Sequence, residues 1–96
     1  MSDSADLLPT YLDTEGRVTC WPSRQRRAAQ RAVLDYLAAR FEPGREYTER
    51  EVNDLLRSRH TFDDWALLRR ELFEQGYLNR ARDGSVYWRT PQTKLY

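Results

Sequence analysis

The chain has 96 residues, with 16 Lys and Arg against 15 Asp and Glu, a formal net charge of +1, and one cysteine. A chain of this length forms one small domain whose thin core leaves little room for an enclosed substrate cavity. A single thiol excludes an internal disulfide and a thiolate metal cluster, and no stretch approaches the roughly 20 apolar residues of a membrane span.

The N-terminus lacks the basic start and apolar run of a signal peptide, so we expect a cytoplasmic protein. We expect no cofactor. Residues 1–7 are polar and are expected to be disordered. The rest should form one domain over residues 8–90, followed by a tail at 91–96. Two short β-prone runs around a loop with Asp13 and Gly16 predict an N-terminal β-hairpin over residues 8–21.

The longest predicted helix follows Pro22 and ends at Pro43-Gly44, with Ser23 as its expected N-cap. Its apolar residues recur with the helical period and predict one buried face: Ala29, Val33, Tyr36, Leu37 and Phe41. Residues 17–34 carry arginine but no acidic residue, which makes the start of this helix locally basic.

A second helix is predicted by the capping box of Thr48 and Glu51, in which each side chain accepts a backbone N–H of the other residue. This helix should end near residue 58. A third helix should follow a few residues later, capped by Asp63 or Asp64. Its apolar face should contain Trp65, Leu68 and Leu72, and Gly76 should stop it.

Two strands are predicted at residues 77–80 and 86–89, because the Asp-Gly turn within 82–85 strongly favours a hairpin. The order of elements from the long helix onward is helix, short strand, helix, turn, helix, strand, turn, strand. This order predicts an α+β fold: a winged helix-turn-helix with three helices and a C-terminal β-wing, preceded by the N-terminal β-hairpin.

Four stretches together resemble a known family: DTEGRVTCWPSRQRRAA, FEPGREYTEREVNDLL, H-x-x-D followed by LLRREL, and GYLNRARDGSVYWR. The chain is similar over residues 8–89 to an uncharacterised prokaryotic winged-helix-like domain-of-unknown-function family, found alone or attached to bacterial transcriptional regulators. The resemblance implies the fold and a regulatory setting, and it brings no established catalytic or binding residues.

We therefore expect a bacterial DNA-binding transcriptional regulator or accessory domain that contacts the phosphate backbone of double-stranded DNA. The candidate contacts are eight arginines from the start of the long helix, the third helix and the wing: Arg24, Arg26, Arg27, Arg69, Arg70, Arg80, Arg82 and Arg89. This requires the arginines of the long helix and those of the wing to share one surface. Asp63 and Asp64 oppose the prediction, because carboxylates at the start of a reading helix repel phosphates.

The alternative is a winged-helix protein-interaction module that does not bind DNA and uses an exposed Trp65 on a protein partner or in a homodimer. An enzyme is the least favoured class, since no catalytic constellation is present. His60, Asp63 and Asp64 are close in sequence, but they fall short of the three or four well-placed ligands of a zinc site, and the single thiol is distant.

Overall fold

The computed structural model describes residues 8–91, so the segment predicted to be disordered (1–7) and most of the predicted tail (92–96) lie outside the described residues. The chain forms a 3-10 helix, three α-helices and three strands in this range. In chain order they are η1 (Leu8–Tyr11), α2 (Arg27–Ala38), β1 (Glu46–Thr48), α3 (Glu49–Arg57), α4 (Trp65–Glu74), β2 (Leu78–Arg80) and β3 (Val86–Arg89).

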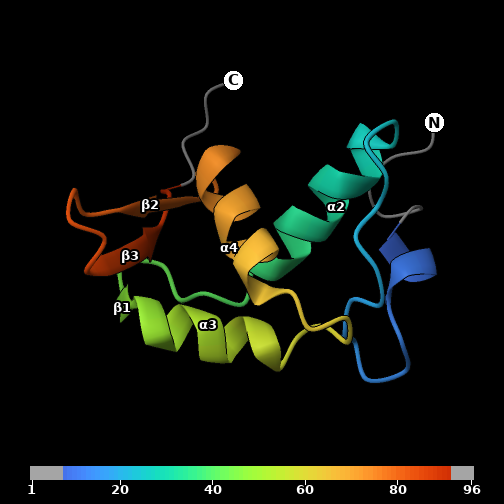
Figure 1. Cartoon of the computed structure of the whole chain (residues 1–96), viewed down its shortest axis with the longest axis horizontal. Coiled ribbons are helices and arrows are strands. Elements are labelled where there is room, and N and C mark those ends of the chain that lie inside the picture. The colour runs from blue at the N-terminus through green and yellow to red at the C-terminus, as the bar shows by residue number, and fades with distance from the viewer. Residues whose placement is uncertain (1–7, 92–96) are drawn as a thin grey trace.

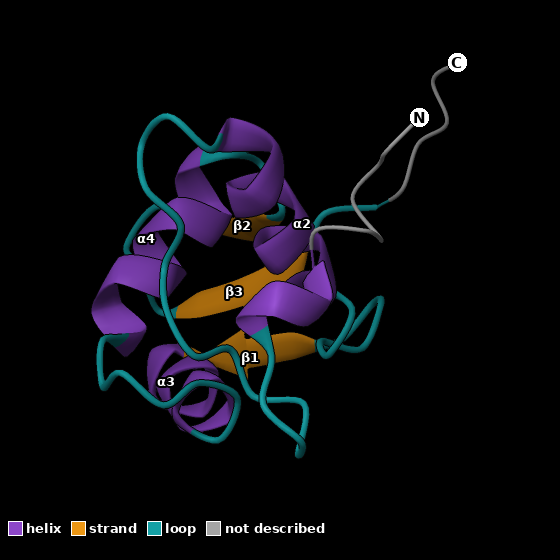
Figure 2. Cartoon of the chain, turned by 90° about the vertical axis from the view of Figure 1, so that its right-hand side faces the viewer, coloured by secondary structure: helices purple, strands orange, loops and turns teal. Residues whose placement is uncertain are grey.

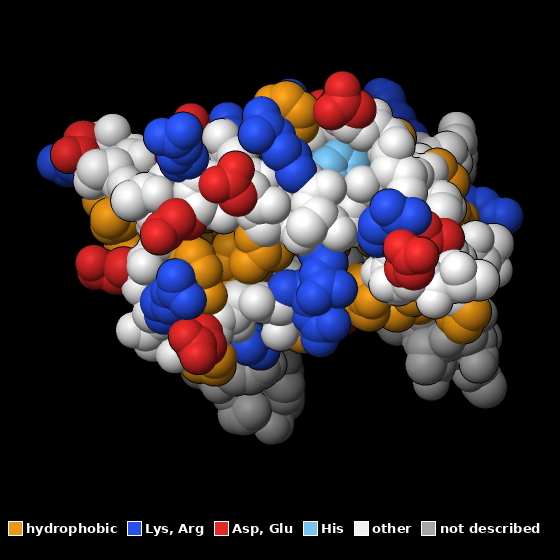
Figure 3. Space-filling view, turned by 90° about the horizontal axis from the view of Figure 1, so that it is seen from below, with side chains coloured by type: hydrophobic (Ala, Val, Ile, Leu, Met, Phe, Trp, Pro, Cys, Tyr) orange, Lys and Arg blue, Asp and Glu red, His pale blue; other side chains and the backbone are white. Residues whose placement is uncertain are grey.

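The sheet is antiparallel with strand order β1-β3-β2, so the last strand of the chain lies in the middle. The sheet lies at one end of the molecule, and α2, α3 and α4 pack together beside it (Figures 1 and 2). Seen from below, acidic and basic side chains alternate over the surface between patches of hydrophobic side chains (Figure 3). The predicted α+β class is confirmed, as are the two C-terminal strands.

The two faces of the sheet differ. Tyr47 lies opposite Tyr87, and both are buried with Leu78 against the helices. Because side chains alternate along a strand, Trp88 faces the other way and is only half-buried, opposite Glu46 on β1. One face of the sheet therefore closes the core, and the other carries a large aromatic ring toward the surface.

The core draws on the three α-helices, on the three strands and on two loop residues, Val18 and Phe41. Its fully buried side chains come from separate parts of the chain: Val18, Val33, Leu34, Leu37, Phe41, Val52, Leu56, Leu68, Leu72, Leu78 and Tyr87. The apolar face predicted for the long helix is confirmed for Ala29, Val33 and Leu37, with Tyr36 at its partly exposed edge. The predicted end at Pro43-Gly44 is wrong, because α2 ends at Ala38, and Phe41 is buried from the loop that follows. Burial raises the pKa of Tyr77 to about 12, helped by the carboxylate of Asp35 on α2.

The start of α2 differs from the prediction. The helix begins at Arg27, four residues after Ser23, and its N-cap Arg26 makes no side-chain cap hydrogen bond within the described chain. Ser23 instead offers its carbonyl to the Arg26 N–H at 2.8 Å in a separate turn. The Gln30 amide donates to the carbonyls of Pro22 (2.9 Å) and Ser23 (3.2 Å), which keeps this turn bent away from the helix.

The caps of α3 and α4 agree with the sequence. Thr48 Oγ1 accepts the Glu51 N–H at 3.1 Å, and Glu51 Oε1 accepts the Thr48 N–H at 2.9 Å, which completes the capping box. Of the two candidate caps of α4, the structure selects Asp64, whose Oδ1 accepts the Leu67 N–H at 3.2 Å. Asp63 has a positive φ of 54° and belongs to the preceding turn.

The strands of the predicted N-terminal hairpin are wrong, although its reversal at residues 13–16 is present. The first run forms the 3-10 helix η1, in which Pro9 has no N–H to give to a ladder. In the second run only Val18 bridges Leu12. The Asp13 N–H donates to the Arg17 carbonyl at 2.9 Å and the Thr19 N–H donates to the Tyr11 carbonyl at 2.8 Å, so the local pairing is a single antiparallel bridge and not a ladder of two strands. The backbone of Val18 itself bonds to the chain on either side of His60, a distant segment.

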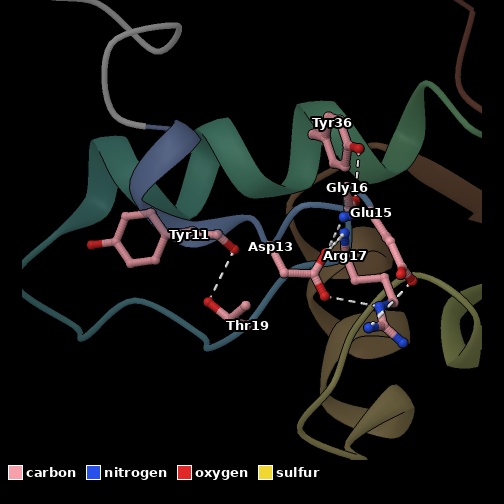
Figure 4. Close-up of polar contacts among 7 residues, drawn as sticks. All are labelled: Tyr11, Asp13, Glu15, Gly16, Arg17, Thr19 and Tyr36. Carbon is pink, nitrogen blue, oxygen red and sulfur yellow. Dashed lines mark hydrogen bonds and ion pairs between the residues drawn. The ribbon is translucent and has the colours of Figure 1, made fainter.

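A compact turn holds this reversal (Figure 4). Asp13 Oδ1 accepts the N–H groups of Glu15 (2.9 Å) and Arg17 (2.8 Å), and its Oδ2 accepts Arg17 Nε–H at 2.9 Å. The backbone hydrogen bond from Arg17 is the main cause that lowers the pKa of Asp13 below its usual value. Gly16, at a φ of 79°, accepts the Tyr36 hydroxyl at 2.7 Å, which ties the turn to α2.

Substitution of Gly16 tests how closely the turn and α2 approach. A Cβ added at Gly16 lies 2.8 Å from Tyr36 Oη, whereas one added at Gly84 meets no described atom within 4 Å at nearly the same φ. We expect Gly84→Ala to lower the free energy of unfolding in urea by about 1 kcal/mol, the cost of a left-handed alanine. Gly16→Ala should cost more, and the excess should vanish in a Tyr36→Phe background.

The loss of stability at low pH tests the role of the Asp13 carboxylate in this turn. A carboxyl whose pKa is lowered on folding contributes stability above its unfolded pKa, and this contribution is lost as the pH falls through the folded pKa. Asp13→Asn should therefore flatten the fall of the melting temperature below about pH 4, the ordinary range of an aspartate. An unchanged loss of stability at low pH would show that the turn does not depend on the charge. Asp83→Asn offers a comparison, because hydrogen bonding to the Ser85 N–H lowers the pKa of Asp83 in a separate turn.

Candidate nucleic-acid interface

The turn between α3 and α4 is fixed from both sides. On one side, the Val18 N–H donates to the Arg59 carbonyl at 2.8 Å, and the Thr61 N–H donates to the Val18 carbonyl at 2.9 Å. Val18 is fully buried, so these bonds are sheltered from water. They set where α3 ends and from which direction the chain enters α4.

On the other side, His60 joins the ends of the two helices. Its Nε2 accepts the Asp64 N–H at 2.8 Å, which requires Nε2 to be unprotonated. The neutral ring therefore carries its hydrogen on Nδ1, which donates to the Leu56 carbonyl at 2.6 Å. The ring is 6 % exposed and packs edge-on against Phe62. His60 thus has a structural role that connects the last turn of α3 to the N-cap of α4.

Oriented in this way, α4 turns one face toward β2 across a hollow of about 410 Å³. The α4 residues that line it follow the helical period, and two residues of the sheet complete it: Ala66, Arg69, Arg70, Phe73, Glu74, Arg80 and Tyr87. Three of the eight arginines predicted to bind nucleic acid, Arg69, Arg70 and Arg80, therefore share one concave surface. Ala66 and Phe73 were not among the predicted site residues, although their spacing from Arg69 and Arg70 places all four on one face of α4.

The three arginines are held differently. Arg69 is the most constrained, since its Nη1 donates to Asn53 Oδ1 on α3 at 2.5 Å and lies 3.7 Å from Glu49 Oε2. Arg70 is 60 % exposed, and its contact with Glu71, at 4.0 Å, is at the limit of an ion pair. The Arg80 guanidinium lies 4.1 Å from the centre of the Phe73 ring, which positions it without neutralising it.

The other predicted arginines lie elsewhere. Arg24, Arg26 and Arg27 are exposed, just before or at the start of α2. That end of α2 lies at the opposite end of the molecule from β2 and β3 (Figure 1). The expectation that the long helix and the wing share a basic surface is therefore not met. Arg82 is exposed in the turn between β2 and β3. Arg89 is half-buried, donates from Nη1 to the Phe41 carbonyl at 3.1 Å, and lines a different hollow.

Trp65, the candidate for a protein interface, is half-buried. One side of its ring packs against the core, and the Arg57 guanidinium covers it at 4.1 Å. Arg57 in turn lies 3.7 Å from Asp54 Oδ1 on the same helix. The Trp65 indole is therefore less exposed than the sequence analysis predicted. Asp63 and Asp64 beside it are both exposed.

Two further observations concern other kinds of site. Among residues 8–91, no group of three His, Cys, Asp or Glu side chains is arranged to hold a metal ion. In the same part of the chain, every helix is too short or too polar to cross a bilayer.

The fold and its hollow define a small α+β domain with three helices, a three-stranded antiparallel sheet and arginines gathered between α4 and β2. The model of a family described as an uncharacterized protein conserved in bacteria (DUF2087) matches residues 17–89. The chain belongs to this family, so the expected membership of an uncharacterised bacterial family is confirmed over residues 17–89. Neither a curated protein nor a solved structure matched the chain.

Replacement of His60 tests its bridging role. His60→Leu keeps the ring's approximate bulk but leaves the Leu56 carbonyl and the Asp64 N–H without their partner. We expect the free energy of unfolding in urea to fall by about 2–3 kcal/mol, the cost of leaving buried polar groups unsatisfied. His60→Gln, which can still present an acceptor toward Asp64, should lose less. Equal stability of wild type and His60→Leu would mean that the two hydrogen bonds contribute nothing to the fold.

Proposed function

We propose that this domain is a winged helix-turn-helix that binds double-stranded DNA as a bacterial transcriptional regulator or accessory domain. The observation that carries the proposal is the convergence of Arg69, Arg70 and Arg80 on the hollow between α4 and β2. The order of elements supports it: α3 and α4 stand in the place of the helix pair, and β2, β3 and their turn in the place of the wing.

The contacts within the hollow indicate which arginines are available to bind phosphate and which have a structural role. Arg70 is exposed and weakly paired, so it is available to a phosphate. Arg80 is a positioned cation on β2, and Arg82 is exposed in the turn that follows. Arg69 already bonds to Asn53 and pairs with Glu49, so its main role is to fix the angle between α3 and α4.

The start of α4 sets a limit on the mode of binding. In a helix-turn-helix the first residues of the second helix approach the bases. Here Asp63 and Asp64 are exposed at that point, and their carboxylates repel the flanking phosphates. The proposed contact therefore uses the middle of α4 and the wing. It favours recognition of the backbone over direct reading of base edges.

The arginines of the wing and α4 should dominate DNA binding. We expect Arg70→Ala, Arg80→Ala and Arg82→Ala, combined in one variant, to weaken binding and to reduce the salt slope by about one unit for each lost phosphate contact. Fluorescence anisotropy of a short labelled duplex at about 50 and about 200 mM salt measures both quantities. The matched control is the triple variant Arg24→Ala, Arg26→Ala, Arg27→Ala, which removes the same charge at the other end of the molecule.

The outcomes of this titration distinguish DNA binding at the hollow from attraction by net charge and from the second candidate function. Equal losses in both triple variants would show that net charge, not the hollow, attracts DNA. Wild-type protein that fails to bind at low salt would end the DNA proposal and leave the second candidate, a protein-interaction module. That candidate is favoured by one observation, the exposed carboxylates beside the half-buried Trp65. Arg57→Glu, which reverses the charge stacked on Trp65, should then disturb association with the partner without unfolding the domain.

A further inference from the structure

A second hollow lies on the opposite rim of the sheet and takes no part in the proposed DNA contact. It measures about 400 Å³ and is formed by the loop that follows α2, the first residue of β1 and the end of β3: Pro43, Gly44, Glu46, Trp88, Arg89, Thr90 and Pro91. This volume falls in the range of small-molecule pockets, which begins at roughly 300 Å³. Two prolines and an indole ring give it a mostly apolar lining.

Arg89 places a cation in this apolar setting. Arg89 lines the hollow, and its Nη1 donates to the Phe41 carbonyl, which restrains the guanidinium. A guanidinium has five N–H donors, and no other hydrogen bond or carboxylate partner of Arg89 is found within residues 8–91. A fixed, half-buried cation with donors to spare beside an aromatic ring is suited to an anion that carries an apolar group.

Glu46 is the opposite charge on the same hollow, and the two side chains differ in exposure. Glu46 is exposed on β1, whereas Arg89 is half-buried. Charges in contact with bulk water are screened, and partly buried ones interact more strongly. Arg89 therefore dominates the attraction, and Glu46 disfavours a ligand that bears a second carboxylate.

We propose that this hollow binds a small aromatic monocarboxylate, with the carboxylate on Arg89 and the ring against Trp88 and the prolines. The site is separate from the hollow between α4 and β2, so its occupancy does not depend on DNA binding. Trp88 and Arg89 both lie on β3, the strand that also forms part of the wing, so a bound ligand would contact the same strand.

The test uses the intact protein and three probes that divide the ligand into its parts. 3-Phenylpropanoate has the ring and the carboxylate, phenethylamine has the ring with an ammonium group, and acetate has the carboxylate alone. The indole N–H resonance of Trp88 in a heteronuclear NMR spectrum reports the hollow, and that of Trp21 is the internal reference. We expect 3-phenylpropanoate to move the Trp88 resonance at lower concentration than either other probe.

Substitutions then separate charge from packing. Arg89→Gln should weaken 3-phenylpropanoate binding by about tenfold, the effect of one charge-assisted hydrogen bond, and Arg89→Lys should recover part of it. Arg82→Gln, which removes an arginine from the wing turn, should leave this binding unchanged. The proposal is overturned if the Trp88 resonance does not respond, if phenethylamine binds as well as 3-phenylpropanoate, or if Arg89→Gln binds like the wild type. Melting curves of each variant establish that it is folded when the titration is made.

Discussion

Val18 is buried, and its backbone bonds to Arg59 and Thr61 on either side of His60. The imidazole of His60 completes the arrangement by joining the Leu56 carbonyl to the Asp64 N–H. Two short segments about forty residues apart thus determine how α4 leaves α3. The angle between α3 and α4 determines where Arg69 and Arg70, on α4, lie relative to Arg80 on the adjoining strand β2, and so determines the hollow between α4 and β2.

The charge of the domain is arranged in separate places. One group of arginines lies at the start of α2, a second lines the hollow between α4 and β2, and Arg89 faces a hollow on the far rim of the sheet. A formal charge of +1 therefore conceals arginines that lie in separate places, the last of them with Glu46 on the same hollow. Three groups that point in different directions cannot all contact one straight duplex closely, so each group calls for its own explanation.

Much of the fold could be predicted because its signals are local. The capping box of Thr48 and Glu51, the Asp-Gly turn between β2 and β3 and the spacing of the apolar residues in α2 each depend on neighbours within a few positions. The errors occur where a distant residue decides the outcome. Val18 pairs with the turn at His60, and Gln30 holds the turn at Ser23, so neither the hairpin strands nor the expected cap is formed.

The candidate site was predictable only in part for the same reason. The sequence selected Arg69, Arg70 and Arg80 by charge, but it could not show that these three share a hollow while Arg24 and Arg89 lie elsewhere. Nor could it show that Arg69 is engaged by Asn53 and Glu49, two residues of another helix. Which arginines are available to a ligand depends on packing between elements, and residue type alone does not encode this.

The strand order has a consequence for how the domain reaches its native state. Within residues 8–91, β3 comes after β1 and β2 in the sequence and pairs with both of them. During synthesis, β1 and β2 cannot join this sheet until β3 has left the ribosome, so the sheet must assemble after α2, α3 and α4 have been made. Sheet pairing that joins distant segments is slow relative to helix formation. The nascent domain should thus pass through a helical stage in which the apolar side chains of Tyr47 and Leu78 are not yet covered by Tyr87.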